Sequence, residues 1–296
     1  MLALPALPLV RPSAAATTAS PPTRGDRALA QFRPLKMKTG VVASADGSAL
    51  LELAHTKVVC SVFGPQPAEG REYTEHGHLD CSLRLASFAR RPRINGRAAA
   101  AEERALSLDL AAALSASVQL HLLPKAAVAV HVLVLQDDGG ALPAAISCAS
   151  LALADAGIAL YGLVAACCCH VLGDTIALDC CTAEASAAAA GTVLVGCMPP
   201  LEQLTLLRHQ GAVPPARATE ALKVGLEGCA LLHAEMAMVL RASSASRDER
   251  AASAALASSS QHKRARSAEG EAPDGDEGTS AAPPCGGEAA GSGAGE

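Results

Sequence analysis

The stretch Val128-Ala-Val-His-Val-Leu-Val-Leu-Gln-Asp-Asp-Gly-Gly-Ala-Leu-Pro143 decides the fold of this chain. Its first eight residues are apolar apart from one histidine, which is typical of a strand that is buried on at least one face. The Asp-Asp-Gly-Gly segment that follows predicts a turn, because glycine adopts backbone angles that other residues avoid. A run of small residues then ends in Leu151-Ala-Leu-Ala-Asp-Ala-Gly-Ile158, and this run predicts a helix.

Three blocks precede this stretch in a specific order: Arg33-Pro-Leu-Lys-Met-Lys-Thr-Gly40, Ala45-Asp-Gly-Ser-Ala-Leu-Leu-Glu52 and His55-Thr-Lys-Val-Val-Cys-Ser-Val-Phe-Gly-Pro65. Together with the strand, the Asp-Gly-Gly turn and the helix, they resemble the ribonuclease PH family over roughly residues 24–241. The resemblance implies an α+β fold, in which two sheet-plus-helix halves form one domain.

Hydrophobic periodicity predicts the elements of both halves. The first half should hold a curled antiparallel sheet with strands at 40–45, 49–53, 57–63 and 79–86, a helix at 101–119, a strand at 127–135 and a helix at 143–156. The second half should hold strands near 163–172, 175–178 and 192–198, and a final helix at 216–241.

The two ends of the 296-residue chain differ in composition from its middle. Residues 1–23 are rich in Ala, Pro, Ser and Thr, and residues 243–296 consist mostly of Ala, Ser, Gly, Glu and Pro. Segments of this kind bury too little apolar surface to offset the entropy of ordering them. We therefore predict one folded domain over residues 24–242 between two disordered tails.

The turn after the long strand lacks the groups that the family uses to hold phosphate. In active relatives this turn presents a hydroxyl residue, an arginine and another small or hydroxyl residue, whereas here the three positions are Ala141, Leu142 and Pro143. None of these side chains donates a hydrogen bond. The acidic positions of active relatives fall at about Ala185 and Gly191, and the nearby Glu184 is predicted to be a solvated loop residue. The resemblance therefore implies no catalytic residues and no cofactor.

Basic positions of active ring subunits are also lost. An arginine pair at the start of the helix near residue 101 is replaced by Ala101 and Glu102, and a third basic position is Gln66. A basic segment close to a channel position of the family remains, and its candidate RNA contacts are Arg84, Arg90, Arg91, Arg93 and Arg97. A solvated loop or a contact to another subunit explains this segment equally well.

This pattern of losses resembles a non-catalytic ring subunit of the eukaryotic RNA exosome. The resemblance implies a hexameric ring with other ribonuclease PH-like subunits, capped by RNA-binding subunits, through which RNA passes during processing and degradation in the nucleus, nucleolus and cytoplasm. The formal net charge of −5 argues against a free-standing nucleic-acid binder. Two alternatives remain, namely an active phosphorolytic 3′–5′ exoribonuclease or tRNA-trimming enzyme and a stand-alone regulatory domain.

The 11 cysteines lie mostly in apolar runs, which favours buried reduced thiols over disulfides. Cys167-Cys-Cys-His170 suggests zinc, but neighbouring strand residues face opposite sides and no CxxC spacing occurs, so no metal is expected. No uninterrupted apolar run is long enough for a membrane span. The basic Lys263-Arg-Ala-Arg266 favours nuclear targeting, with a transit peptide in residues 1–23 as the alternative.

Overall fold

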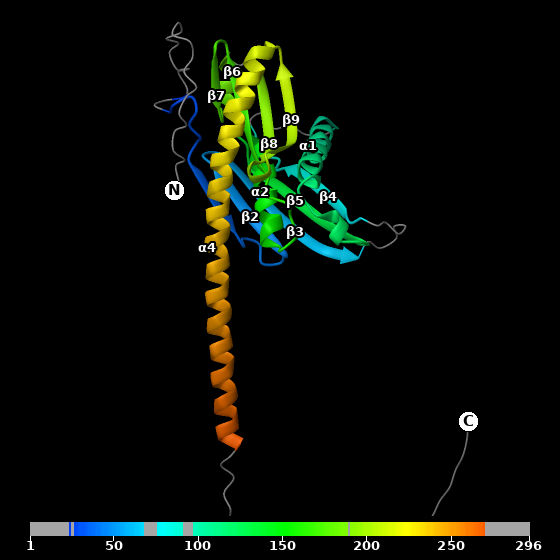
Figure 1. The fold of residues 1–296 in the computed structure, drawn as a ribbon, viewed down its shortest axis with the longest axis vertical. Coiled ribbons are helices and arrows are strands. Elements are labelled where there is room, and N and C mark those ends of the chain that lie inside the picture. The colour runs from blue at the N-terminus through cyan, green and yellow to red at the C-terminus, as the bar shows by residue number, and fades with distance from the viewer. Residues whose placement is uncertain (1–23, 25–26, 68–75, 91–96, 189, 270–296) are drawn as a thin grey trace, which may run out of the picture. The chain divides into compact units, whose positions relative to one another are not determined.

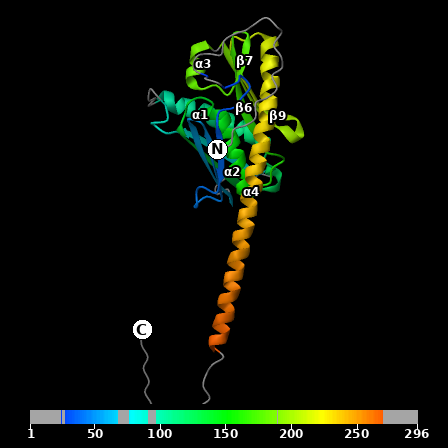
Figure 2. The same ribbon diagram turned by 90° about the vertical axis from the view of Figure 1, so that its left-hand side faces the viewer.

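The computed structural model describes residues 24, 27–67, 76–90, 97–188 and 190–269, which form two β-sheets with helices packed against them (Figure 1). The first sheet has the strand order β1-β2-β3-β5-β4, and the second has the order β7-β6-β8-β9. The two sheet-plus-helix halves predicted from the sequence are confirmed. A view turned by 90° shows α3 beside the second sheet and α1 beside the first (Figure 2).

The strands of the first sheet are β1 (Leu35–Thr39), β2 (Gly47–Leu53), β3 (Thr56–Pro67), β4 (His78–Leu85) and β5 (Ala126–Gln136). The strands of the second sheet are β6 (Ala165–Leu172), β7 (Thr175–Leu178), β8 (Gly191–Met198) and β9 (Gln203–Gly211). The α-helices are α1 (Arg97–Ser115), α2 (Ala141–Asp155), α3 (Thr182–Ala188) and α4 (Pro215–Glu269), and two short 3₁₀ helices span Leu120–Leu122 and Pro199–Leu201.

The first sheet is mixed, so the prediction of an antiparallel sheet is wrong for one pair of strands. β4 runs parallel to β5, with Leu83 opposite Val132, whereas the other neighbours are antiparallel. Helix α1 lies between β4 and β5 in the chain and makes the crossover that parallel neighbours require. The hydrophobic pattern along a strand is the same whether its neighbour runs parallel or antiparallel to it. The pattern therefore could not predict the direction of pairing.

Helix α2 packs on both sheets and is the centre of the core, with 14 of its 15 residues buried. Its small residues allow the strands to approach closely, and the contact with β2 is the tightest. A Cβ atom added to Gly47 would lie 2.3 Å from the backbone nitrogen of Ala156 and 2.4 Å from the carbonyl oxygen of Ala152. The Asp-Gly turn of the second sequence block is therefore required by packing as well as by chain reversal.

Several predicted elements need correction. The strand expected at 40–45 is the turn after β1, and Gly40 has a φ of 67° there. Strands β1 and β9 and helix α3 were missed. β1 ends just before the predicted strand, β9 has no fully buried residue, and α3 has only seven residues. The other predicted strands and helices are present, with ends that differ by a few residues.

Helix α4 continues to Glu269, well beyond the predicted end at residue 241. The tail prediction is therefore wrong for residues 243–269, whose eight Ala and four Arg residues favour helix without a core. The chain divides into two units after Ala245, so this helix belongs partly to each. Residues 1–23 and 270–296 lie outside the described residues. In the described part of the chain, no helix has the length and apolar character needed to cross a membrane.

Candidate functional site

A cleft of about 1280 Å³ opens at the Asp-Gly-Gly turn between β5 and α2. Its wall is completed by Glu102 of α1, by Cys168 and His170 of β6, and by residues of α3, β8 and β9. The cleft therefore lies where both halves of the fold meet, and the turn predicted from the sequence lies at its edge.

The Asp-Gly-Gly turn is held from behind by an arginine of the N-terminal segment. The guanidinium of Arg33 donates to the carbonyl oxygens of Asp138 and Gly139 over 3.0 and 2.9 Å. The hydroxyl of Thr56 also donates to the Gly139 oxygen, and the Gly139 N–H donates to the Asp137 carboxylate over 2.9 Å. These bonds fix the backbone of the turn and engage the Asp137 carboxylate at its start.

The first turn of α2 brings Ala141, Leu142 and Pro143 to the cleft, as the sequence predicts. Their side chains are buried, and Gly140 at the helix N-terminus makes no side-chain capping bond. Ala185 also lines the cleft. Gly191 does not, because it packs against β9, where an added Cβ would lie 2.4 Å from Cγ2 of Val213 and 2.6 Å from the oxygen of Gln210. A carboxylate could not replace Gly191 without moving the backbone.

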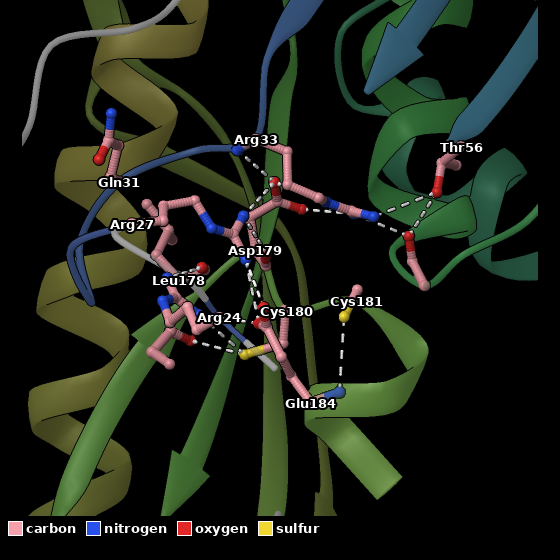
Figure 3. Close-up of polar contacts among 12 residues, drawn as sticks. Arg24, Arg27, Gln31, Arg33, Thr56, Leu178, Asp179, Cys180, Cys181 and Glu184 are labelled. Carbon is pink, nitrogen blue, oxygen red and sulfur yellow. Dashed lines mark hydrogen bonds and ion pairs between the residues drawn. The ribbon is translucent and has the colours of Figure 1, made fainter. Parts of the chain in front are cut away.

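Two carboxylates next to the cleft are neutralised by three N-terminal arginines (Figure 3). Glu184 is only 2% exposed and lies 3.0 Å from Arg24 and 2.8 Å from Arg27. Asp179 lies 2.6 Å from Arg33 and also accepts the Arg33 backbone N–H over 2.9 Å. The prediction of a solvated Glu184 is therefore wrong, since α3 turns this side chain into the protein.

The Arg33–Asp179 pair is the tightest part of this cluster. Burial on its own would lower the pKa of Arg33, but the hydrogen bond and the ion pair with Asp179 raise it overall. Sequence reasoning missed the role of these arginines. Their concentration in residues 24–33, beside the single acidic Asp26, was a signal that acidic partners lie elsewhere in the chain.

Each lysine or arginine that lines the cleft in the described part of the chain has an acidic partner. Lys57 lies 3.5 Å from Glu52, and Arg208 pairs with Asp109. Arg90 pairs with both Glu102 of α1 and Asp137 of the Asp-Gly-Gly turn. Burial would lower the pKa of Arg90, yet its hydrogen bonds to these two carboxylates raise it. Glu102, where the sequence resemblance implies an arginine in active relatives, binds an arginine here.

Three of the five predicted RNA contacts lie in the described part of the chain. Arg90 faces the cleft in these ion pairs, Arg97 is exposed at the first residue of α1, and Arg84 is exposed on β4. Arg91 and Arg93 lie outside the described residues. RNA contact by these arginines therefore stays a prediction.

His170 and Cys168 lie on the same side of β6 and line the cleft, with the Cys168 sulfur 3.9 Å from Nδ1 of His170. Burial lowers the pKa of His170, although Asp179 and Glu184 act in the opposite direction. Burial also raises the pKa of the Cys168 thiol. Both groups therefore favour their neutral forms at pH 7, which does not suit a thiolate nucleophile. Among the described residues, no group of three His, Cys, Asp or Glu side chains could hold a metal ion.

Comparison with known proteins identifies the family. Residues 31–159 match the RNase PH family, described as the 3′ exoribonuclease family, domain 1. Human exosome complex component MTR3 is 38% identical over 226 residues, which cover 71% of this chain and 82% of the human protein. The chain belongs to the RNase PH family. The match agrees with the resemblance to exosome component six, the mRNA transport regulator homologue, that the degenerate motifs suggest.

Other RNase PH relatives include proteins of plants and archaea. An exosome complex component RRP41-like protein of Arabidopsis thaliana is 34% identical and covers 75% of this chain and 86% of the plant protein. Exosome complex component Rrp41 of Cenarchaeum symbiosum is 35% identical, and the aligned region covers 69% of this chain and 84% of the archaeal protein. The crystal structure of rice Rrp46 has the same fold, with a TM-score of 0.64 and 24% identity over 73% of this chain and 98% of the rice chain.

Proposed function

We propose that this chain is a non-catalytic structural subunit of the RNA exosome core ring. In that role it supports 3′–5′ RNA processing and degradation, including rRNA processing, RNA surveillance and mRNA turnover, without cleaving RNA itself. One observation carries the proposal: the turn that should hold phosphate presents Ala141, Leu142 and Pro143 to the cleft. The relatives named exosome complex components support the assignment to this assembly.

The chemistry of phosphorolysis explains why this cleft is unsuited to it. Phosphate attacks the terminal phosphodiester, a nucleoside diphosphate leaves, and the departing 3′ oxygen takes up a proton. The reaction needs cations for the attacking anion and an acid for the leaving oxygen. Here Lys57, Arg90 and Arg208 are paired with carboxylates, and Asp179 and Glu184 are held by arginines. For the rival assignment, an active phosphorolytic exoribonuclease, the described cleft residues offer no unpaired lysine or arginine to bind the attacking phosphate.

A phosphorolysis assay tests this proposal. The full-length chain would be incubated with 3′-labelled RNA, inorganic phosphate and magnesium, beside an active relative prepared in the same way. We expect no nucleoside diphosphate above the level of a protein-free reaction, whereas the active relative releases it. Release by this chain that disappears when residues 139–143 are replaced would refute the non-catalytic assignment.

The proposed partners are other RNase PH-like exosome subunits in the ring and RNA-binding subunits above it. Strand β9 supports assembly, because it forms an edge of the second sheet and carries exposed leucines. The exposed fractions of Leu204 and Leu207 are 48% and 53%. Natural proteins usually cover an open apolar strand edge. A stable contact would bury roughly 1,000 Å² or more.

Co-expression tests this assembly. We expect the chain alone to be poorly soluble, and co-expression with an RNase PH-like partner that retains its acidic residues to give a soluble complex. Leu207→Asp should reduce the recovery of that complex, whereas Leu226→Asp on α4, at 37% exposure in the parent, serves as the matched control. A concentration-independent monomer that ignores such partners would contradict the ring assignment.

We also propose a location in the nucleus and nucleolus, and in the cytoplasm. The basic Lys263-Arg-Ala-Arg266 near the end of α4 supports nuclear entry. Replacing Lys263, Arg264 and Arg266 by alanine in a fluorescent fusion should shift the protein toward the cytoplasm. Accumulation of the parent fusion in an organelle other than the nucleus would instead favour a transit peptide in residues 1–23.

A further inference from the structure

Helices cover one face of the five-stranded sheet, and the other face is open. In β3 the inward residues Val58, Cys60 and Val62 are fully buried, whereas the residues between them are partly exposed. In β5 the same alternation leaves His131 and Leu133 exposed, with Leu133 at 42%. We call the outward side of β1–β5 the open face.

One row of the open face crosses all five strands. The strand register places Lys38 opposite Leu50, Leu50 opposite Val59, Val59 opposite Leu133, and Leu133 opposite Arg84. The row is apolar in its centre and carries one cation at each end. With strands about 4.8 Å apart, the two cations are separated by about 19 Å along the row.

Two rings lie beside this row on neighbouring strands. Phe63 of β3 and His131 of β5 have ring centroids 5.9 Å apart and planes tilted by 56°. Ser82 of β4 fixes the orientation of the imidazole, since its hydroxyl lies 2.7 Å from Nδ1 of His131. The open face thus presents a preformed pair of flat side chains.

The charge of the open face is opposite to that of the whole chain. Its outward charged side chains on these strands are Lys36, Lys38, Lys57 and Arg84 against Glu52 and Asp80, so four positive charges less two negative charges leave +2. The formal charge of the whole chain is −5. Lys57 is paired with Glu52, but Lys36, Lys38 and Arg84 have no ion-pair partner among the described residues.

We propose that the open face binds single-stranded RNA. Bases stack on Phe63 and His131 and cover the apolar row, while Lys38 and Arg84 bind the phosphates that flank it. Sheets with rings on neighbouring strands bind two or three bases in this way, and stacking does not depend on sequence. The unpaired cations at both ends of the row favour RNA over an apolar protein partner. Phe63, His131 and the two flanking cations lie outside the cleft, although Lys57 borders both surfaces, and RNA binding here goes beyond the proposed role in the ring.

Fluorescence anisotropy with a fluorescein-labelled 12-nucleotide oligouridine tests the proposal on the full-length chain, purified in complex with its co-expressed RNase PH-like partner. The double variant Lys38→Gln with Arg84→Gln should raise Kd at least fivefold. It should also reduce the slope of log K against log salt concentration by about 1.4, because each phosphate contact on a single strand contributes about 0.7 to that slope. The matched control, Lys223→Gln with Arg241→Gln, removes two exposed charges from α4 and should leave Kd within twofold.

A second pair of variants separates stacking from charge. Phe63→Ala with His131→Ala should weaken binding at least fivefold, because each stacked base contributes strongly to affinity. Phe63→Tyr keeps a ring and should bind like the parent. Thermal melts would show that these chains are folded, and a 4-thiouridine oligonucleotide should crosslink to peptides that contain Phe63 or His131, also within the assembled complex.

Two outcomes would overturn the proposal. In one, all open-face variants bind oligouridine with the parent affinity and no crosslink maps to β3 or β5. In the other, the variants lose a co-purifying subunit while their RNA affinity is unchanged, which would make the open face a protein interface. Neither outcome bears on the phosphorolysis assay, so failure here is distinct from failure of the non-catalytic assignment.

Discussion

Glu184 allows the sharpest test of how the N-terminal segment is held to the second sheet. Its carboxylate accepts hydrogen bonds from Arg24 over 3.0 Å and from Arg27 over 2.8 and 3.0 Å, and it is 2% exposed. Glu184→Ala leaves the side chain of Arg24, which is 0% exposed, without its only carboxylate partner among the described residues. Removing one partner of a buried pair costs about 3–5 kcal/mol.

The same guanidinium shows why the cost should be high. Arg24 also donates to the carbonyl oxygens of Ala28, Leu29 and Leu178, so it cannot leave the interior without breaking these bonds. Each kcal/mol lowers Tm by about 2–4 °C for a domain of this size, so Glu184→Ala should melt roughly 6–20 °C below the parent. Glu184→Gln, which keeps the shape and one acceptor, should lose less.

Thermal melts followed by circular dichroism, together with urea titrations, would measure these differences. The control is Glu220→Gln, which breaks an exposed ion pair with Arg217 and should leave the free energy of unfolding close to that of the parent. If Glu184→Ala were as stable as the Glu220→Gln control, the buried cluster would not be what holds residues 24–33 in place.

Four further predictions concern other parts of the chain. Gly47→Ala should destabilise the fold by about 3 kcal/mol or more, because its Cβ would overlap α2, whereas Gly162→Ala, with its nearest contacts at 3.8 Å, should be close to neutral in a urea titration. The pKa of His170 is lowered in the fold, so its neutral form stabilises the protein above the unfolded pKa of about 6.5, and this stability is lost as the pH falls below that value. The Tm of the parent should therefore fall between pH 7.5 and pH 5, and His170→Gln should reduce this fall. Leu142→Arg alone should release no nucleoside diphosphate from RNA, because the acidic positions stay empty, and any release above background would contradict this. Truncation after Arg247 should leave Tm and complex recovery unchanged, and a lower Tm would place the domain boundary further along α4.

The sequence by itself determined the family, the central strand–turn–helix and the absence of hydrogen-bond donors on the side chains of residues 141–143. These features are local: a buried strand, a glycine turn and a helix of small residues each show within a short window. The tertiary structure decided the rest. The parallel pairing of β4 with β5 and the row from Lys38 to Arg84 depend on strand order, which periodicity does not encode.

The charged groups show the same division most clearly. In the sequence, a lone Glu184 cannot be told from a solvated residue. In the fold its carboxylate accepts a hydrogen bond from Arg24, which is 160 residues away in the chain. Arg90 looked like a free cation in a basic loop until Glu102 and Asp137, from two other elements, were placed beside it. Whether a charge is free or paired depends on distances between segments far apart in the chain, because Coulomb energy and desolvation are set by the folded neighbourhood and not by the local sequence.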